Sequence, residues 1–145
     1  GFRFFTVYGP WGRPDMAYFL FSNQIRDSKK IILHDKGRML RDMTFIEDIV
    51  LGIKSGIDLI LKEDFGRHEL FNLGCNKPIK TKDLLTFVGE YLKKDYLIEN
   101  IDINFESRYT HADLTKSKNI LGYDPKTNFE TGMLEFLKWF DEYGK

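Results

Sequence analysis

Short apolar runs alternate along the chain with longer segments in which hydrophobic residues recur every three or four positions. Residues 2–8 form an apolar run rich in β formers that ends at Gly9, which is typical of a buried parallel strand leading into a loop. Residues 31–33 and 69–73 are shorter runs of the same kind, and residues 101–105 alternate as an edge strand does. The pattern therefore predicts strands in these places.

The amphipathic segments carry recognisable helix start and stop signals. Thr44 and Glu47 form a capping box, in which the hydroxyl and the carboxylate satisfy free backbone N–H groups at a helix start. Thr127 and Glu130 repeat this pattern, and Gly122 marks the end of a short helix. We expect helices to begin at or near Pro14, Thr44, Thr81, Asp113 and Thr127.

The alternation of strands and helices, without repeats or low-complexity linkers, indicates an α/β fold. No internal boundary is visible, so we expect residues 1–145 to form a single unit. The chain opens directly in an apolar strand and has no initiator methionine. From this start we expect a segment of a longer protein.

Charge and composition argue against several classes of function. The 22 basic and 22 acidic residues cancel, so we expect no binding to nucleic acid or to an anionic membrane. Cys75 is the only cysteine, and no signal peptide or apolar span of about twenty residues is present, which favours a soluble cytoplasmic protein. His34, His68 and His111 lie far apart without neighbouring ligands, so we expect no metal site.

Four blocks of sequence resemble the extended short-chain dehydrogenase/reductase family, and within it the UDP-glucuronate 4-epimerases. Residues 3–17 read RFFTVYGPWGRPDMA, residues 37–50 read GRMLRDMTFIEDIV, and residues 71–78 read FNLGCNKP. The fourth block combines Ala112-Asp113 with Leu121-Gly122-Tyr123 and Pro125. The resemblance implies the C-terminal part of a Rossmann-type fold, comprising the last strands of the parallel sheet and the small substrate-binding subdomain.

The resemblance also implies which residues face a nucleotide sugar. Thr6 and Arg13 match residues that contact the sugar, where the planar guanidinium suits the carboxylate of a uronic acid. Arg41 matches the arginine that such enzymes place on the UDP diphosphate. Without the family motif, a surface ion pair or a contact at a helix end would be the better interpretation of each arginine, and Thr6 could bond the backbone of a buried strand.

Further matches concern the uracil and the cofactor. Ile32 and His34 occupy the strand whose backbone pairs with uracil in relatives, although an aromatic residue commonly stands where His34 does. Phe4 and Phe5 match a strand end that packs beside the nicotinamide ring of NAD, and they would also suit a hydrophobic core. A second departure lies at residues 105–108, near which family members commonly have a Pro-Gly-Asp segment. Arg108 in this segment could contact phosphate or lie on the surface.

The chemical machinery of the family is not visible in this chain. A dinucleotide needs a glycine-rich turn at a helix N-terminus, and the sequence has none. The family's catalytic base is a Tyr with a Lys four residues later, and none of the 7 tyrosines has that partner. We therefore expect no catalytic residue here and no activity of this chain alone. In relatives both elements precede the strand matched by residues 2–8.

The resemblance implies that the parent protein oxidises carbon 4 of a UDP-sugar with NAD, rotates the keto sugar and returns the hydride to the other face. Members of the family are often homodimers, and the helices that form their dimer precede the segment matched here. A dehydratase or reductase of the same family is an alternative, because one scaffold hosts several chemistries. A non-catalytic module that binds nucleotide sugars is the other.

Overall fold

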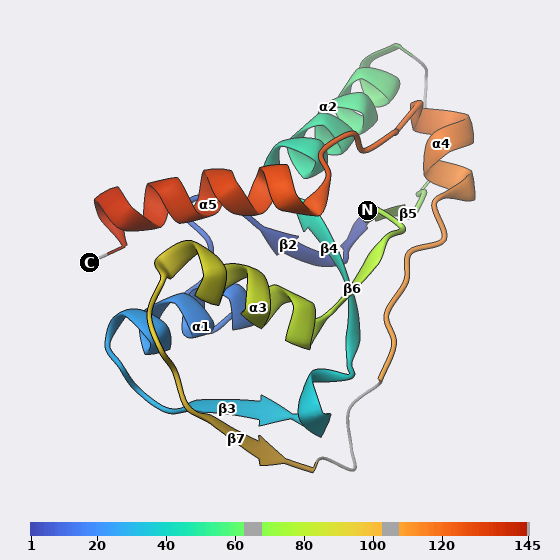
Figure 1. Ribbon diagram of the computed structural model, residues 1–145. Coiled ribbons are helices and arrows are strands. Elements are labelled where there is room, and N and C mark those ends of the chain that lie inside the picture. Colours follow the sequence, from blue (N-terminus) through green and yellow to red (C-terminus); the bar gives the residue numbers. More distant parts are fainter. Residues whose placement is uncertain (63–67, 103–107, 145) are drawn as a thin grey trace.

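The structure, a computed structural model, describes residues 1–62, 68–102 and 108–144, and it is built from alternating strands and helices (Figure 1). The predicted α/β class is confirmed. The elements are β1 (Phe2–Phe4), β2 (Thr6–Tyr8), α1 (Ala17–Arg26), β3 (Ile31–His34), the 3-10 turn η1 (Asp35–Gly37), β4 (Leu40–Phe45), α2 (Ile46–Lys62), β5 (Phe71–Leu73), β6 (Pro78–Lys80), α3 (Thr81–Leu92), β7 (Ile98–Ile101), α4 (Thr115–Leu121) and α5 (Phe129–Tyr143).

The single strand predicted over residues 2–8 is in fact two strands that belong to different sheets. β1 pairs in parallel with β5, and β2 pairs in parallel with β4. The backbone changes partner at Phe5, whose N–H still donates to the Leu73 carbonyl at 3.0 Å. A continuous apolar run does not reveal such a change, because both halves are apolar and the partners lie far along the chain.

Two strands were not predicted at all. β4 runs between β2 and β6, pairing in parallel with the first and antiparallel with the second. Its sequence, LRDMTF, mixes charged and apolar residues, so it lacks the pattern of a strand. The predicted capping role of Thr44 is wrong: this residue lies within β4, and its hydroxyl donates to Asp42 Oδ1 at 3.5 Å. α2 follows β4 without an intervening loop.

The other helix starts were predicted to within three residues. Asn128, not Thr127, caps α5 by accepting a hydrogen bond from the Thr131 N–H at 2.8 Å. Thr81 is the first residue of α3, and its hydroxyl donates to the Met39 carbonyl rather than capping the helix. Asp113 accepts from the first N–H of α4 at 2.9 Å. Gly122 ends α4 with a φ of 64°, as predicted.

The outermost part of the molecule is a ribbon of β3 and β7, paired in parallel at the bottom of Figure 1. The edge strand predicted over residues 101–105 begins earlier, because β7 covers Ile98–Ile101. Residues 103–107 lie outside the described part of the chain. The side chains of Ile32 and His34 both point outward from β3 and are exposed.

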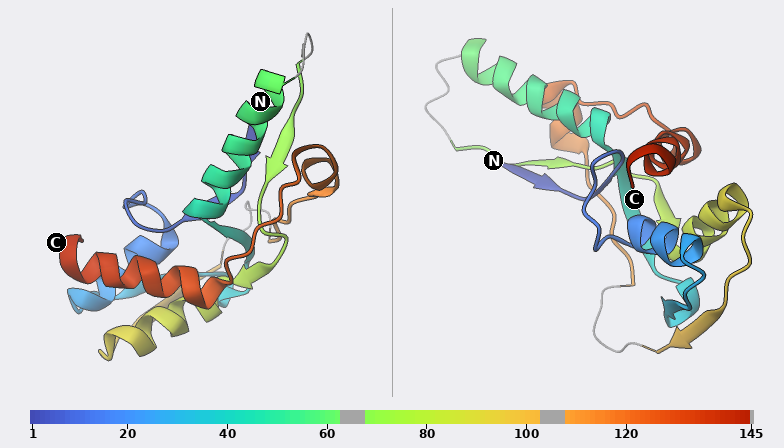
Figure 2. Two further views of the ribbon diagram at one scale, coloured as in Figure 1. Left: turned by 90° about the horizontal axis from the view of Figure 1, so that it is seen from above. Right: turned by 90° about the vertical axis from the view of Figure 1, so that its left-hand side faces the viewer.

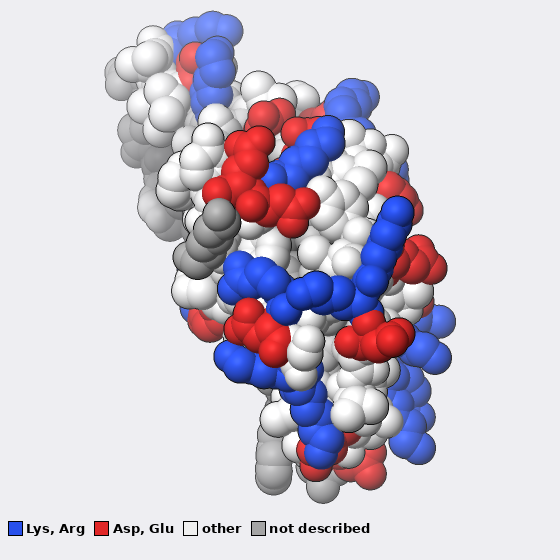
Figure 3. Space-filling model, turned by 60° about the vertical axis from the view of Figure 1, so that its left-hand side comes forward, with Lys and Arg blue, Asp and Glu red and all other residues white. Residues whose placement is uncertain are grey.

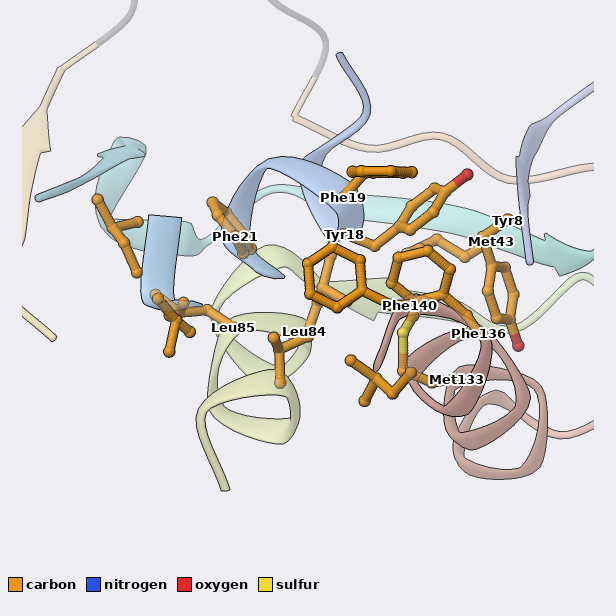
Figure 4. Close-up of a cluster of buried hydrophobic side chains, with 14 of the residues drawn as sticks. Tyr8, Tyr18, Phe19, Phe21, Met43, Leu84, Leu85, Met133, Phe136 and Phe140 are labelled. Atoms are coloured by element: carbon orange, nitrogen blue, oxygen red, sulfur yellow. The ribbon is translucent and has the colours of Figure 1, made fainter. Parts of the chain in front are cut away.

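The buried side chains of the described residues form two hydrophobic cores. The first lies between α1, α3 and α5 and the strands β2, β3 and β4, and Figure 4 shows its aromatic centre, where Tyr18 packs edge-on against Phe136 with ring centroids 4.7 Å apart. Each buried aromatic ring of this kind stabilises the fold by about 1.5–3 kcal/mol. The second core lies under α2 and α4 and includes Ile49, Leu73 and Tyr123. In Figure 2 α2 and β1 lie at one end of the molecule and β7 at the other.

The surface view in Figure 3 shows basic and acidic side chains interspersed, without a broad field of one sign. None of the helices in the described ranges combines the length and the apolar character that crossing a membrane requires.

Candidate functional site

The loop between β2 and α1 forms one wall of a cavity of about 440 Å³. Phe4 and Phe5 line the cavity from the strand end, and Trp11 and Arg13 line it from the loop. The remaining lining is largely apolar and includes Met16 from the end of the loop. We call this space the first cavity. It brings together three residues that the resemblance assigns to sugar or cofactor: Phe4, Phe5 and Arg13.

Two glycines fix the course of this loop. Gly9 has a φ of 142°, and a Cβ there would lie 2.6 Å from Ile46 Cγ2 at the start of α2. A Cβ on Gly12 would lie 1.9 Å from the hydroxyl of Tyr18 in α1. Both positions therefore require glycine, because the backbone approaches a neighbouring element too closely for a side chain. Burial raises the pKa of Tyr18 to about 12, so this phenol is neutral at physiological pH.

Arg13 and Asp15 form a two-pronged ion pair beside the first cavity. Arg13 Nε donates to Asp15 Oδ1 at 3.0 Å, and Arg13 Nη2 donates to Oδ2 at 2.5 Å. The hydrogen bond from Arg13 lowers the pKa of the Asp15 carboxyl, and the same bond raises the pKa of Arg13. The pair with Asp15 holds the guanidinium in an orientation that suits a carboxylate. Because the Arg13 side chain is 71% exposed, it also remains accessible to a second carboxylate.

A second cavity of about 580 Å³ contains the residues assigned to the nucleotide. Ile32 and His34 line it from β3, and Arg41 lines it from β4. Met16 borders both cavities, and Asp15 lines the second while pairing with Arg13 of the first. The two spaces therefore adjoin at the start of α1. We call the cavity of about 580 Å³ the second cavity.

The surroundings of Arg41 and Thr6 differ. Arg41 is half-buried, and its Nη1 donates to the Leu40 carbonyl at 3.2 Å. Thr6 is half-buried in β2, opposite Met43 of β4, and it lines neither cavity. The structure thus brings six of the seven assigned residues to two adjoining cavities and leaves Thr6 beside them.

Sequence reasoning missed Asp42, the residue that holds the strand of Arg41 in place. Its side chain is fully buried, and its carboxylate accepts backbone hydrogen bonds from Cys75 at 2.9 Å, Asn76 at 3.1 Å and Ala112 at 2.8 Å. These bonds tie β4 to the loop after β5 and to the segment before α4. The signal in the sequence was that Asp42 and Ala112 both lie in blocks shared with the family.

A second buried acid lies beside the second cavity. Asp35, in η1, forms ion pairs with Arg38 and with Arg108, whose Nε is 3.5 Å from Asp35 Oδ2. The hydrogen bond from Arg38 lowers the pKa of the Asp35 carboxyl. Arg108 is 74% exposed, so this pairing is compatible with either of the roles considered for it.

Cys75 is a half-buried residue whose thiol is hydrogen-bonded to the backbone. Its thiol donates to the Met43 carbonyl at 3.1 Å. Burial and the nearby Asp42 carboxylate raise the pKa of Cys75 to about 12, so the reactive thiolate is nearly absent at neutral pH.

Comparison with known proteins places this geometry in a family. The model of the NAD dependent epimerase/dehydratase family matches residues 1–74, which is just over half of the 145 residues. Uncharacterized protein MJ1055 of Methanocaldococcus jannaschii is 44% identical over 147 residues, covering 98% of this chain and 42% of its own length. UDP-glucuronate 4-epimerase 5 of Arabidopsis thaliana is 39% identical over 153 residues, covering 97% of this chain and 35% of its own length.

A solved structure of a family member has a similar fold. The UDP-glucuronic acid 4-epimerase of Bacillus cereus, in complex with UDP-glucuronic acid and NAD, superposes with a TM-score of 0.87 at 25% identity. That alignment covers 97% of this chain and 44% of the Bacillus chain. The chain described here spans less than half of the length of each of these relatives.

The matches confirm the resemblance inferred from the four sequence blocks, including the Rossmann-type fold of relatives and NAD as the cofactor of the family. The chain belongs to the NAD dependent epimerase/dehydratase family.

Proposed function

We propose that the protein containing this chain interconverts UDP-glucuronate and UDP-galacturonate, and that residues 1–145 supply its substrate-binding part. One observation carries the proposal: two adjoining cavities present Arg13 and Arg41 on either side of Met16. A UDP-uronate has two anionic groups of different shape, a carboxylate and a diphosphate. Because each arginine lines one of two cavities that share Met16, the arrangement suits a ligand of that kind.

In this proposal Arg13 binds the sugar carboxylate. The geometry of the Arg13–Asp15 pair supports this role, because a carboxylate already accepts both donors of the guanidinium fork. A substrate carboxylate would replace Asp15 at the same donors, with the same bidentate geometry. Thr6 would approach the sugar from β2, and its hydroxyl can donate or accept a single hydrogen bond.

Arg41 binds the diphosphate, and β3 binds the uracil. Arg41 extends from β4, a strand fixed by the buried Asp42, so its position is set by the fold and not by a mobile loop. Ile32 and His34 line the second cavity from β3. Their backbone would pair with the uracil edge, while the exposed Ile32 side chain offers an apolar contact to the base.

NAD would meet this chain at the first cavity. Phe4 is 51% exposed at the cavity wall, and together with Phe5 it offers a flat apolar surface of the kind that a nicotinamide ring packs against. When bound, NAD supplies hydride transfer at carbon 4 of the sugar. The residues of this chain would orient the sugar ring and exclude water from its face. We expect no turnover from residues 1–145 alone, because no Tyr in them has a Lys four positions later.

The test uses the full-length protein, NAD and UDP-glucuronate, with UDP-galacturonate measured by ion-exchange chromatography. Arg13→Ala should raise KM for UDP-glucuronate by about tenfold or more, because a charged hydrogen bond contributes about 1.5–3 kcal/mol. UDP-glucose, which has no carboxylate, should lose much less. Arg3→Ala is the matched control, since Arg3 is exposed on β1 and lines neither cavity.

The same assay separates the alternatives. Equal losses on both sugars would refute the carboxylate role of Arg13. A keto-deoxy product would identify a dehydratase, and a reduced sugar with consumption of the reduced cofactor would identify a reductase. Tight binding of the UDP-sugar by the full-length protein, without any turnover, would identify a binding module.

A further inference from the structure

Trp11 has an unusual backbone in the middle of the loop that carries Arg13. Its φ is 62°, in the left-handed region that bulky side chains rarely adopt. Its side chain is also 79% exposed, so burial in the core does not explain the conformation. Such a strained residue persists only where the surrounding structure holds it, and strain of this kind concentrates at functional sites.

Two aromatic residues near the end of α5 hold Trp11. Its ring centroid lies 5.3 Å from that of Trp139 and 6.1 Å from that of Tyr143, with the latter pair nearly parallel at 28°. Trp139 is in turn anchored to the first core through Phe19 and Phe136, whose rings both lie 6.0 Å away. Figure 2 shows the loop between β2 and α1 lying beside the C-terminal end of α5. We call Trp11, Trp139 and Tyr143 the aromatic clasp.

The clasp contacts the loop from α5, whereas Tyr18 contacts it from α1. Gly12 lies directly against the Tyr18 hydroxyl, so the loop is enclosed between α1 and α5 at consecutive residues. Arg13 follows immediately and lines the same cavity as Trp11. Trp139 and Tyr143 do not line the first cavity. They therefore do not contact a ligand there directly and act through the residues that they hold, among which is the loop at Trp11.

We propose that Trp11 is a positioning residue: the aromatic clasp holds the loop in its strained conformation, so that Arg13 faces the first cavity and selects acidic sugars. This inference rests on the carboxylate role given to Arg13 in the proposed function. It adds that the specificity of the site depends on a contact with α5, more than 120 residues away along the chain. Aromatic contacts of this geometry are favourable beyond the area that they bury.

The first variants act from outside the cavity. Trp139→Leu and Tyr143→Ala remove the clasp without touching the wall of the first cavity, and Glu142→Ala is the matched control, because Glu142 is an exposed neighbour on α5. In the full-length protein both clasp variants should raise KM for UDP-glucuronate by about five- to tenfold, since part of the charged hydrogen bond is lost. The kcat and the KM for UDP-glucose should stay within about twofold.

Two substitutions of Trp11 separate the ring from the strain. Trp11→Ala removes the ring and leaves a residue that still disfavours positive φ, so the loop should relax and the preference for uronates should fall. Trp11→Gly also removes the ring but accepts positive φ readily, so it should retain more of that preference. A larger loss in Trp11→Gly than in Trp11→Ala would contradict the role of strain.

Two measurements that need no substrate report on the clasp itself. Coupling of the Trp11 and Trp139 indoles should give a circular-dichroism couplet that disappears in Trp11→Ala and in Trp139→Leu. Hydrogen exchange of the backbone in residues 9–16 should become faster in both variants and stay unchanged in Glu142→Ala. Unchanged exchange in Trp139→Leu would show that the clasp does not hold the loop, and the proposal would be overturned.

The kinetic outcomes are equally decisive. The proposal is overturned if the couplet is lost while the preference for UDP-glucuronate over UDP-glucose is retained. It is also overturned if both substrates lose kcat equally and thermal stability falls in parallel, because that result describes a structural role. If the wild-type protein showed no preference for uronates, the proposed function would be refuted, and with it the role of Trp11 in selecting acidic sugars. The hydrogen-exchange data would still decide whether the aromatic clasp holds the loop.

Discussion

The buried carboxylate of Asp42 offers the sharpest test of how this site is held. It accepts hydrogen bonds from the backbone N–H groups of Cys75, Asn76 and Ala112, at distances between 2.8 and 3.1 Å. These donors belong to two segments that are far from β4 in the sequence. Asp42→Ala would remove the common acceptor of three hydrogen bonds that are buried or partly buried, and it would leave three backbone donors without their partner.

The expected cost follows from those three bonds. A buried donor left without an acceptor costs about 1–3 kcal/mol, so the upper range is about 3–9 kcal/mol. Entry of water into the space of the lost carboxylate should bring the cost to about 3–5 kcal/mol, which is a large part of the stability of an ordinary domain. Asp42→Asn keeps one acceptor oxygen but loses the charge, and it should cost roughly half as much.

The measurement combines stability with local exchange. Urea unfolding of the full-length protein gives the free energy of unfolding. Hydrogen exchange gives the protection of the backbone amides of Cys75, Asn76 and Ala112. Asp58→Ala is the control, because Asp58 is an acid on the surface of α2 whose partner is the exposed Lys54. A loss in Asp42→Ala of less than about 1 kcal/mol, with protection of the amides at 75, 76 and 112 unchanged, would refute the reasoning.

Three further predictions follow from single contacts. Asp15→Asn should tighten binding of UDP-glucuronate by a few-fold in calorimetry, because the competing carboxylate on Arg13 is weakened; weaker binding would mean that Asp15 orients the arginine instead. Cys75 should react with iodoacetamide at pH 8 roughly a thousandfold more slowly than a free cysteine and should speed up only as the pH rises toward its pKa of about 12, as mass spectrometry of its peptide can establish. Gly132→Ala should destabilise the protein by about 1–3 kcal/mol in thermal unfolding, since a Cβ there would lie 2.4 Å from the Tyr8 hydroxyl, and an unchanged melting temperature would show that α5 shifts freely.

The helices of this protein were largely predictable because their information is local. α5 was expected from its apolar positions, and Met133, Phe136 and Phe140 are all buried in the first core. The end of α4 was predicted from Gly122, which adopts the left-handed conformation that glycine tolerates. The capping residues were placed less well. At the start of α5 both Thr127 and Asn128 can cap a helix, and only the path of the chain selects one of them.

The strands were harder to predict because their partners are distant. A run of apolar residues indicates a buried strand, yet nothing in residues 2–8 shows that the backbone leaves β5 and joins β4 at Phe5. β4 lacks the apolar pattern of a strand because it contains Asp42 and Thr44, which are buried polar residues with partners in the fold. In β4 the polar side chains satisfy backbone groups that a sequence pattern cannot identify.

In the candidate site, too, some features could be predicted from local sequence and others depended on distant contacts. The sequence by itself determined the residue types and the family, because Arg13, Arg41 and the glycines of the first loop occur in motifs of contiguous residues. Only the tertiary structure decided that Arg13 and Arg41 border adjoining cavities, that Asp15 already occupies the guanidinium of Arg13, and that α5 holds the loop through Trp11. The physical reason is distance along the chain: a motif records what neighbouring residues need, whereas a cavity forms where packing brings separate segments together.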